Sequence, residues 1–66
     1  ALPAGLSARE VEVLRLAARG QSNRVIAQAL SISERTAGHH LQHAYEKIGV
    51  STRGAASLFI IEQGLL

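Results

Sequence analysis

Residues 33 to 49 carry two stripes at helical spacing, and this pattern constrains the fold more than any other feature of the chain. The hydroxyl of Ser33 can cap the start of a helix, and Gly49 can end one because glycine adopts the left-handed conformation at little cost. The apolar stripe consists of Ala37, Leu41, Ala44, Tyr45 and Ile48. The polar stripe consists of Arg35, Gly38, His39, Gln42, His43 and Glu46. One face for a core and one for a partner is typical of the second helix of a helix-turn-helix motif, which enters the major groove of DNA.

A capping box predicts another helix near the start of the chain. The Ser7 hydroxyl can accept a hydrogen bond from the Glu10 N–H, while the Glu10 side chain can reach back to the Ser7 N–H. This helix is expected to run from about residue 8 to residue 19 and to end at Gly20. Residues 1–5 are expected to be a loop at the end of a linker, so the predicted domain spans residues 6–66.

A short helix and a tight turn precede the two-striped helix. Ser22 or Asn23 is expected to cap the short helix, which runs to Leu30. This helix is shorter than the roughly 12–15 residues that an isolated helix needs to be stable in water, so tertiary contacts must stabilise it. The turn Ser31-Ile32-Ser33 contains no glycine, and its Ile32 is expected to be buried. Short helix, tight turn and longer helix together predict a helix-turn-helix.

A fourth helix is predicted from about residue 53 to residue 63, with Ser51 or Thr52 as its cap. Its apolar residues are too many for one stripe, and those expected to face the core are Ala56, Phe59 and Ile60. Others would lie outside the core and form a candidate dimer interface: Leu58, Ile61 and Leu65. An ordinary apolar surface, or one covered by a missing domain, is the alternative. With no strand signal, the expected fold is all-α, a four-helix bundle-like domain that contains a helix-turn-helix.

Composition and charge exclude several classes of protein. The chain has no cysteine, so neither disulfides nor a thiolate metal site can stabilise its thin core. Only Tyr45 and Phe59 are aromatic, which argues against a base-stacking platform for single strands. The net charge of +2 permits nucleic-acid binding without establishing it. No apolar run approaches the roughly 18 residues of a membrane span, so we expect no membrane partner. No signal peptide is visible, and together with the DNA-binding interpretation of residues 33–49 this predicts a cytoplasmic location.

No arrangement typical of an enzyme is visible in the sequence. It contains no nucleophile with a paired base, no paired carboxylates in a plausible cleft and no glycine-rich phosphate loop. His39 and His43 do have the spacing of a two-histidine metal site, and Glu46 could be a third ligand. Zinc motifs require more ligands than this, so DNA contact is the preferred interpretation of the two histidines. We therefore expect a binding module without a cofactor or a metal.

A longer pattern covers most of the chain, LSAREVEVLRLAARGQSNRVIAQALSISERTAGHHLQHAYEKIGVSTR. It resembles the C-terminal DNA-binding domain of the LuxR family, which is shared with FixJ-type response regulators. The matching residues are Leu6, Ser7, Arg9, Glu10, Val13, Leu14, Gly20, Ser22, Asn23, Ile26, Ala27, Leu30, Ile32, Ser33, Thr36, His40, Lys47, Gly49, Val50 and Arg53. So many positions in fixed register make a specific match.

The resemblance implies the effector domain of a bacterial-type transcription regulator that binds double-stranded DNA. The third helix, about residues 34–48, would lie in the major groove, and the fourth helix would form a homodimer. The resemblance also implies an N-terminal sensor, receiver or other regulatory domain in the full-length chain. Together with the polar stripe, it indicates these DNA-binding residues: Ser22, Asn23, Arg24, Arg35, Thr36, Gly38, His39, His40, Gln42, His43, Lys47 and Arg53.

Several of these residues match family positions near phosphate. Ser22 and Asn23 correspond to the start of the second helix, where capping is the alternative role, and Arg24 could add a charged contact. Thr36 either approaches the DNA backbone or belongs to a cap or the edge of the core. Lys47 either binds phosphate or complements the helix dipole. Arg53 either binds phosphate or pairs with a carboxylate such as that of Glu10.

The base-reading positions of the family correspond to Gly38, His39 and Gln42. Gln42 could make a bidentate contact with adenine, Arg35 could reach guanine or phosphate, and His40 is expected to be half-buried. Many relatives have lysine where this chain has Gly38. A glycine inside a helix offers no side chain and costs about 0.5–1 kcal/mol relative to alanine. This departure concerns the DNA sequence preference more than the fold.

Two alternative functions remain open. A degenerate helix-turn-helix could serve protein–protein contact or dimerisation with weak or no DNA binding, which Gly38 and the mild net charge favour. A domain like region four of sigma factors would also bind DNA, but the matches at Ser22-Asn23 and Gly49-Val50 fit the LuxR pattern better. Salt dependence separates DNA binding from apolar protein contact, because only phosphate contacts release counterions.

Overall fold

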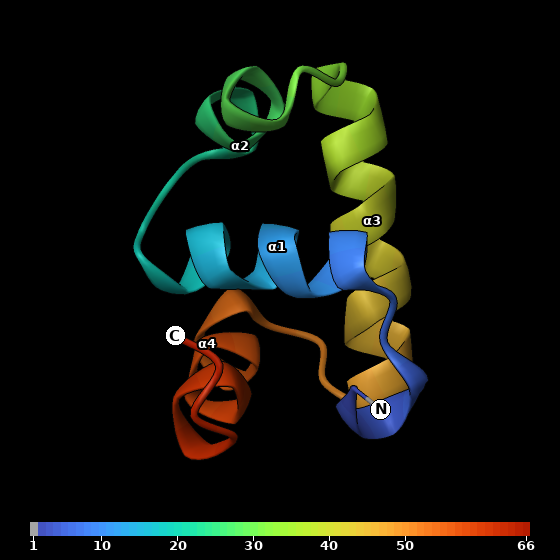
Figure 1. Ribbon diagram of the computed structural model, residues 1–66, viewed down its shortest axis with the longest axis vertical. Coiled ribbons are helices and arrows are strands. Elements are labelled where there is room, and N and C mark those ends of the chain that lie inside the picture. Colours follow the sequence, from blue (N-terminus) through green and yellow to red (C-terminus); the bar gives the residue numbers. More distant parts are fainter. Residues whose placement is uncertain (1) are drawn as a thin grey trace.

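Four α-helices follow one short 3-10 turn in residues 2–66, the part of the chain that the computed structural model describes (Figure 1). The turn is Pro3–Gly5, and the helices are α1 (Ala8–Ala18), α2 (Asn23–Leu30), α3 (Glu34–Ile48) and α4 (Arg53–Glu62). These described residues contain no strand, which confirms the all-α prediction. Ala1, part of the predicted linker end, lies outside them. None of the helices in this part of the chain has the length and apolar character needed to cross a membrane.

The helix α1 lies at the centre of the domain and packs against each of the other three helices. Figure 1 shows α2 on one side of α1, α4 on the other, and the long helix α3 running past the N-terminal end of α1. The α2 helix also packs against α3, so these two helices form the predicted helix-turn-helix. The core side chains come from all four helices and from one residue that lies two positions before α1: Leu6, Val11, Val13, Leu14, Ala17, Ile26, Ala27, Ala37, Leu41, Ala44, Ala56 and Ile60.

Side-chain caps start all four helices. The Ser7 hydroxyl accepts from the Glu10 N–H (3.1 Å), and the Glu10 carboxylate accepts from the Ser7 N–H (2.8 Å), as the capping box predicts. Ser22 rather than Asn23 caps α2, and Thr52 rather than Ser51 caps α4. The first and fourth helices each end one residue before the predicted boundary.

The ends of the helices turn the chain back onto the core. At the end of α4, the Leu65 N–H donates to the Ile60 carbonyl (3.0 Å) while Gly64 adopts φ +66°, which is a Schellman motif. Ser31 follows α2 as Gly64 follows α4, and it has φ +57°. A serine therefore adopts the left-handed conformation in this turn, which contains no glycine. The Ile32 N–H then donates to the Ala27 carbonyl (3.0 Å), and Ile32 packs half-buried against the core instead of being fully buried.

Two expectations about the chain ends need correction. Residues 1–5 were expected to be a loop, but Pro3–Gly5 form a 3-10 turn because the Leu6 N–H donates to the Pro3 carbonyl (3.1 Å). Leu65 was grouped with Leu58 and Ile61 as an exposed apolar residue. It packs half-buried against the core because the Schellman motif folds it back, whereas Leu58 and Ile61 are 55% and 56% exposed.

Candidate nucleic-acid interface

The two faces of α3 separate as the stripes predict. Ala37, Leu41 and Ala44 are buried against the core. On the outer face Arg35, His39, Gln42 and His43 are exposed, whereas Thr36, Gly38 and His40 at its edges are half-buried. An exposed row of hydrogen-bonding side chains therefore runs along a helix whose opposite face is anchored.

Two exposed arginines lie near the start of α2 and the start of α3. Arg24 is the second residue of α2, and Arg35 is the second residue of α3. The hydrogen bonds and ion pairs found in residues 2–66 involve neither guanidinium group. Both are therefore available to an anionic partner at helix ends that carry partial positive charge.

Two side chains of the outer face of α3 contact their neighbours along the helix. The amide Nε2 of Gln42 donates to Glu46 Oε2 (3.3 Å). The rings of His39 and His43 stack with their centroids 6.4 Å apart and their planes inclined by 26°. Within residues 2–66, no cluster of three or more histidine, cysteine or carboxylate side chains could hold a metal ion.

Thr36 belongs to the cap of α3. Its N–H donates to Ser33 Oγ (3.0 Å), and its Oγ1 accepts from the Ser33 hydroxyl (2.8 Å). These bonds agree with the capping role, although a hydroxyl keeps further capacity as donor or acceptor. Its contact with DNA stays a prediction.

Lys47 forms an internal ion pair instead of pointing freely from the end of α3. Its Nζ donates to Glu10 Oε1 (2.8 Å) and to the Gly5 carbonyl (3.2 Å). Burial by itself raises the pKa of the Glu10 carboxyl, but the hydrogen bonds from Lys47 and from the Ser7 N–H outweigh burial, so this pKa lies below its ordinary value. The pair joins the start of α1 to the end of α3.

Arg53 does not pair with Glu10, which rules out one of the two roles expected for it and leaves phosphate contact as a prediction. Its Nη1 donates to the Gln21 carbonyl (2.6 Å) and its Nη2 donates to Asn23 Oδ1 (2.9 Å). The first residue of α4 thus holds the start of α2. No local pattern announces this contact, because 30 residues separate Arg53 from Asn23.

Gly38 lies beside Asn23 at the seam between α2 and α3. A Cβ atom added to Gly38 would lie 3.7 Å from Asn23 Nδ2, which is ordinary van der Waals contact. Lack of space for a Cβ therefore does not explain the glycine at this position.

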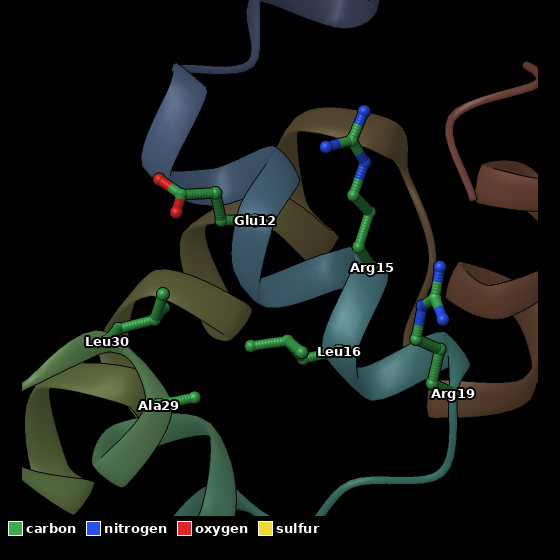
Figure 2. Close-up of a pocket in the computed structure, with 6 residues that line it drawn as sticks. All are labelled: Glu12, Arg15, Leu16, Arg19, Ala29 and Leu30. Carbon is green, nitrogen blue, oxygen red and sulfur yellow. The ribbon is translucent and has the colours of Figure 1, made fainter.

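A concave surface lies between α1 and α2, and none of the candidate DNA-binding residues lines it (Figure 2). Its lining residues are Glu12, Arg15, Leu16, Arg19, Ala29 and Leu30. Arg15 donates through Nε to the Leu65 carbonyl, and Arg19 donates through Nη2 to the Leu66 carbonyl (3.1 Å). These two cations are thus bound to the C-terminal residues of the chain, unlike Arg24 and Arg35.

The family model described as "Bacterial regulatory proteins, luxR family" matches residues 4–60. The probable transcriptional regulatory protein NarL of Mycobacterium tuberculosis is 49% identical over 61 residues, which cover 92% of this chain and 28% of that protein. The transcriptional regulatory protein DegU of Brevibacillus brevis is 42% identical over 59 residues, covering 89% of this chain and 25% of DegU. The nitrate/nitrite response regulator protein NarP of Escherichia coli is 40% identical over 58 residues, covering 88% of this chain and 27% of NarP.

The chain therefore spans about a quarter of the length of these relatives. No solved structure matches it at a significant level.

Proposed function

Because the chain belongs to the luxR family of bacterial regulatory proteins, we propose that it binds double-stranded DNA in a sequence-specific manner, with α3 in the major groove. The observation that carries this proposal is the exposed polar face of α3, opposite a face that is buried in the core. A helix held in this way can present side chains to base edges without giving up its packing.

Phosphate contacts are assigned to the starts of the two helices. Ser22 orders the first turn of α2, where backbone N–H groups and Asn23 can meet a phosphate and Arg24 can add a charge. At the start of α3, Arg35 and Thr36 can contact phosphate in the same way. Such contacts position the protein on the duplex and carry no sequence information by themselves.

Base contacts are assigned to the outer face of α3. Gln42 can offer its amide to the N6 and N7 atoms of adenine once it leaves Glu46. His39 and His43 can donate to guanine or phosphate from the same face, with His40 at its edge. Gly38 brings the helix backbone close to the groove and contributes no side chain. Lys47 and Arg53 already bond within the domain, so any phosphate contact by them is secondary to holding α3 and α2 in place.

The larger protein is proposed to be a cytoplasmic transcription regulator, with a sensor, receiver or other regulatory domain N-terminal to this one. The relatives support this, because each is about four times as long as the matched region and is named as a regulator. A degenerate helix-turn-helix that serves protein contact remains the second candidate. The internal engagement of Lys47 and Arg53 favours it, because fewer cations stay free for phosphate.

Replacing both Arg24 and Arg35 by alanine is expected to weaken binding to duplex DNA by at least tenfold at low salt. The slope of log K against log salt should become shallower by about two, because each lost phosphate contact removes about one unit. Fluorescence anisotropy with random-sequence duplexes at several salt concentrations measures both quantities. Arg15→Gln is the matched control, because it removes one cation that is bound to the Leu65 carbonyl.

Equal salt slopes for the wild type and the double variant would contradict the assigned phosphate contacts. Failure of the wild-type domain to bind DNA even at low salt would favour the protein-contact alternative. When binding is established, selection from a random library identifies the preferred site.

We further propose that Leu58 and Ile61 on α4 form a homodimer interface, with Leu65 at its edge. Their exposure supports this, because two adjacent large apolar side chains on one helix are costly in water. A two-fold dimer would place two copies of α3 on half-sites related by the same symmetry.

The variant Leu58→Gln with Ile61→Gln is expected to raise the dimer dissociation constant at least tenfold while keeping the helical fold. Sedimentation equilibrium over a range of concentrations measures the constant, and circular dichroism checks the fold. Val25→Gln is the control, because Val25 is also exposed (41%) but lies on α2. A variant that dimerises as well as the wild type would rule out this interface.

A further inference from the structure

We propose that Arg53 is a positioning residue that orients the side-chain amide of Asn23, so that its NH₂ group faces a DNA phosphate at the seam between α2 and α3. The inference rests on the proposed DNA binding and assigns to Arg53 an indirect role in it. The starting observation is that Arg53 bridges two residues: its Nη1 donates to the Gln21 carbonyl (2.6 Å), and its Nη2 donates to Asn23 Oδ1 (2.9 Å).

The chemistry of the guanidinium group determines which way the amide points. Arginine has five N–H donors and no acceptor, so the atom of Asn23 that faces it must be the oxygen. The Nδ2 atom then faces away from Arg53, toward α3, where it lies 3.7 Å from the position of a Cβ atom on Gly38. Without Arg53 the amide could turn over or bond to nearby backbone groups, as asparagine side chains commonly do.

The NH₂ group of Asn23 is left available by this arrangement. None of the hydrogen bonds described for residues 2–66 uses Asn23 Nδ2 as a donor. Asn23 and Arg53 are both half-buried, so the charge-assisted bond between them is partly shielded from water. A cation on the oxygen side of an amide also polarises its N–H bonds, which makes them better donors to an anion.

Gly38 keeps the approach to this NH₂ group open. Because Gly38 has no side chain, it places nothing across the amide of Asn23, whose Nδ2 lies 3.7 Å from where a Cβ atom would be. A longer side chain at this position would lie beside Asn23 and compete for the same phosphate oxygen. The glycine and the arginine thus act on one donor group, the first by leaving it uncovered and the second by orienting it.

A direct phosphate contact by Arg53 is the rival explanation, and the two make different predictions. A direct contact contributes counterion release and should act independently of Asn23. A positioning role leaves the salt slope unchanged and disappears when the Asn23 amide is absent.

The test is a double-mutant cycle in duplex DNA affinity with Asn23→Ala, Arg53→Met and the double variant. Each single variant is expected to weaken binding about tenfold, near the low end for one hydrogen bond to a charged group. The double variant is expected to bind no more weakly than either single variant. Arg53→Met should keep the salt slope of the wild type. Thermal unfolding of each variant establishes that the folded protein is being compared.

Arg53→Lys provides a second test, which can be interpreted even if the variant is somewhat less stable than the wild type. Lysine keeps the charge but cannot bridge Gln21 and Asn23 with a planar fork. It should therefore fail to restore DNA affinity if positioning is the role. The side-chain NH₂ resonances of Asn23 should shift on DNA addition in the wild type and much less in Arg53→Lys, whereas those of exposed Gln28 report any general change.

Additive losses, a shallower salt slope in Arg53→Met, or full affinity in Arg53→Lys would each overturn the positioning role and favour direct contact. An Asn23→Ala variant with unchanged affinity would overturn it as well. Absence of DNA binding by the wild type would instead overturn the proposed function, and this inference with it.

Discussion

Replacing Leu14 by alanine is expected to lower the free energy of unfolding by about 3–5 kcal/mol. Leu14 is only 1% exposed and belongs to α1, the helix that packs against all three others. Alanine would remove the buried side-chain surface and leave a cavity that the surrounding helices can only partly close. A domain of 66 residues has a total stability of roughly 3–10 kcal/mol, so this one change should leave much of the protein unfolded at 37 °C.

Urea denaturation followed by circular dichroism at 222 nm measures this loss. Leu58→Ala is the matched control, because it deletes the same atoms from a side chain that is 55% exposed. Its effect should stay within about 0.5 kcal/mol at a concentration where the chain is monomeric. Equal midpoints for the two variants would show that α1 does not anchor the core as described.

Replacing Glu10 by glutamine is expected to lower the free energy of unfolding near pH 7 by about 1.5 kcal/mol. The change removes a carboxylate that accepts hydrogen bonds from Lys47 and from the Ser7 N–H, in a side chain that is only 7% exposed. The estimate lies at the low end for a charged hydrogen bond because the Lys47 side chain is 41% exposed and thus screened by water.

The same carboxylate makes the free energy of unfolding of the wild type depend on pH under acidic conditions. Because the pKa of Glu10 is lower in the folded protein than its ordinary value of 4.5, the unfolded chain binds the proton more readily. The stabilisation is fully present above pH 4.5 and is lost as the pH falls through the lower folded-state pKa. The difference in stability between wild type and Glu10→Gln should therefore shrink as the pH falls below 4.5.

Urea titrations at several pH values measure that difference directly. Glu12→Gln is the control, because Glu12 is an exposed carboxylate whose only ion pair is a 4.0 Å contact with Arg9 within the described residues. It should change the stability little at any pH. A gap between wild type and Glu10→Gln that stays constant in acid would contradict the assigned role of the carboxylate.

Local chemistry explains why the helices could be predicted so closely from the sequence. Ser7, Ser22, Ser33 and Thr52 each satisfy backbone N–H groups within three residues, so the information for each cap lies in a short segment. The burial of one face of α3 followed from its periodicity in the same way. The left-handed conformation of Ser31 was not predicted, because this conformation is typical of glycine and not of serine.

The candidate interface could be predicted only in part. Exposure of Arg24, Arg35, His39, Gln42 and His43 followed from the polar stripe and the helix starts. Their contacts with DNA remain predictions. The partners of the other positively charged side chains, such as Lys47 and Arg53, could not be predicted in this way. In a compact domain, a long charged side chain has several possible partners.

The sequence by itself determined the four helices, their starts to within one residue, and the face of α3 that stays in water, since each depends on groups within about one helical turn. Only the tertiary structure decided that Lys47 meets Glu10 across 37 residues and that Arg53 meets Asn23 across 30. It also decided that Leu65 returns to the core while Leu58 and Ile61 stay outside. The reason is physical: hydrogen bonds within a turn depend on local geometry, whereas these pairings depend on how the helices pack around α1.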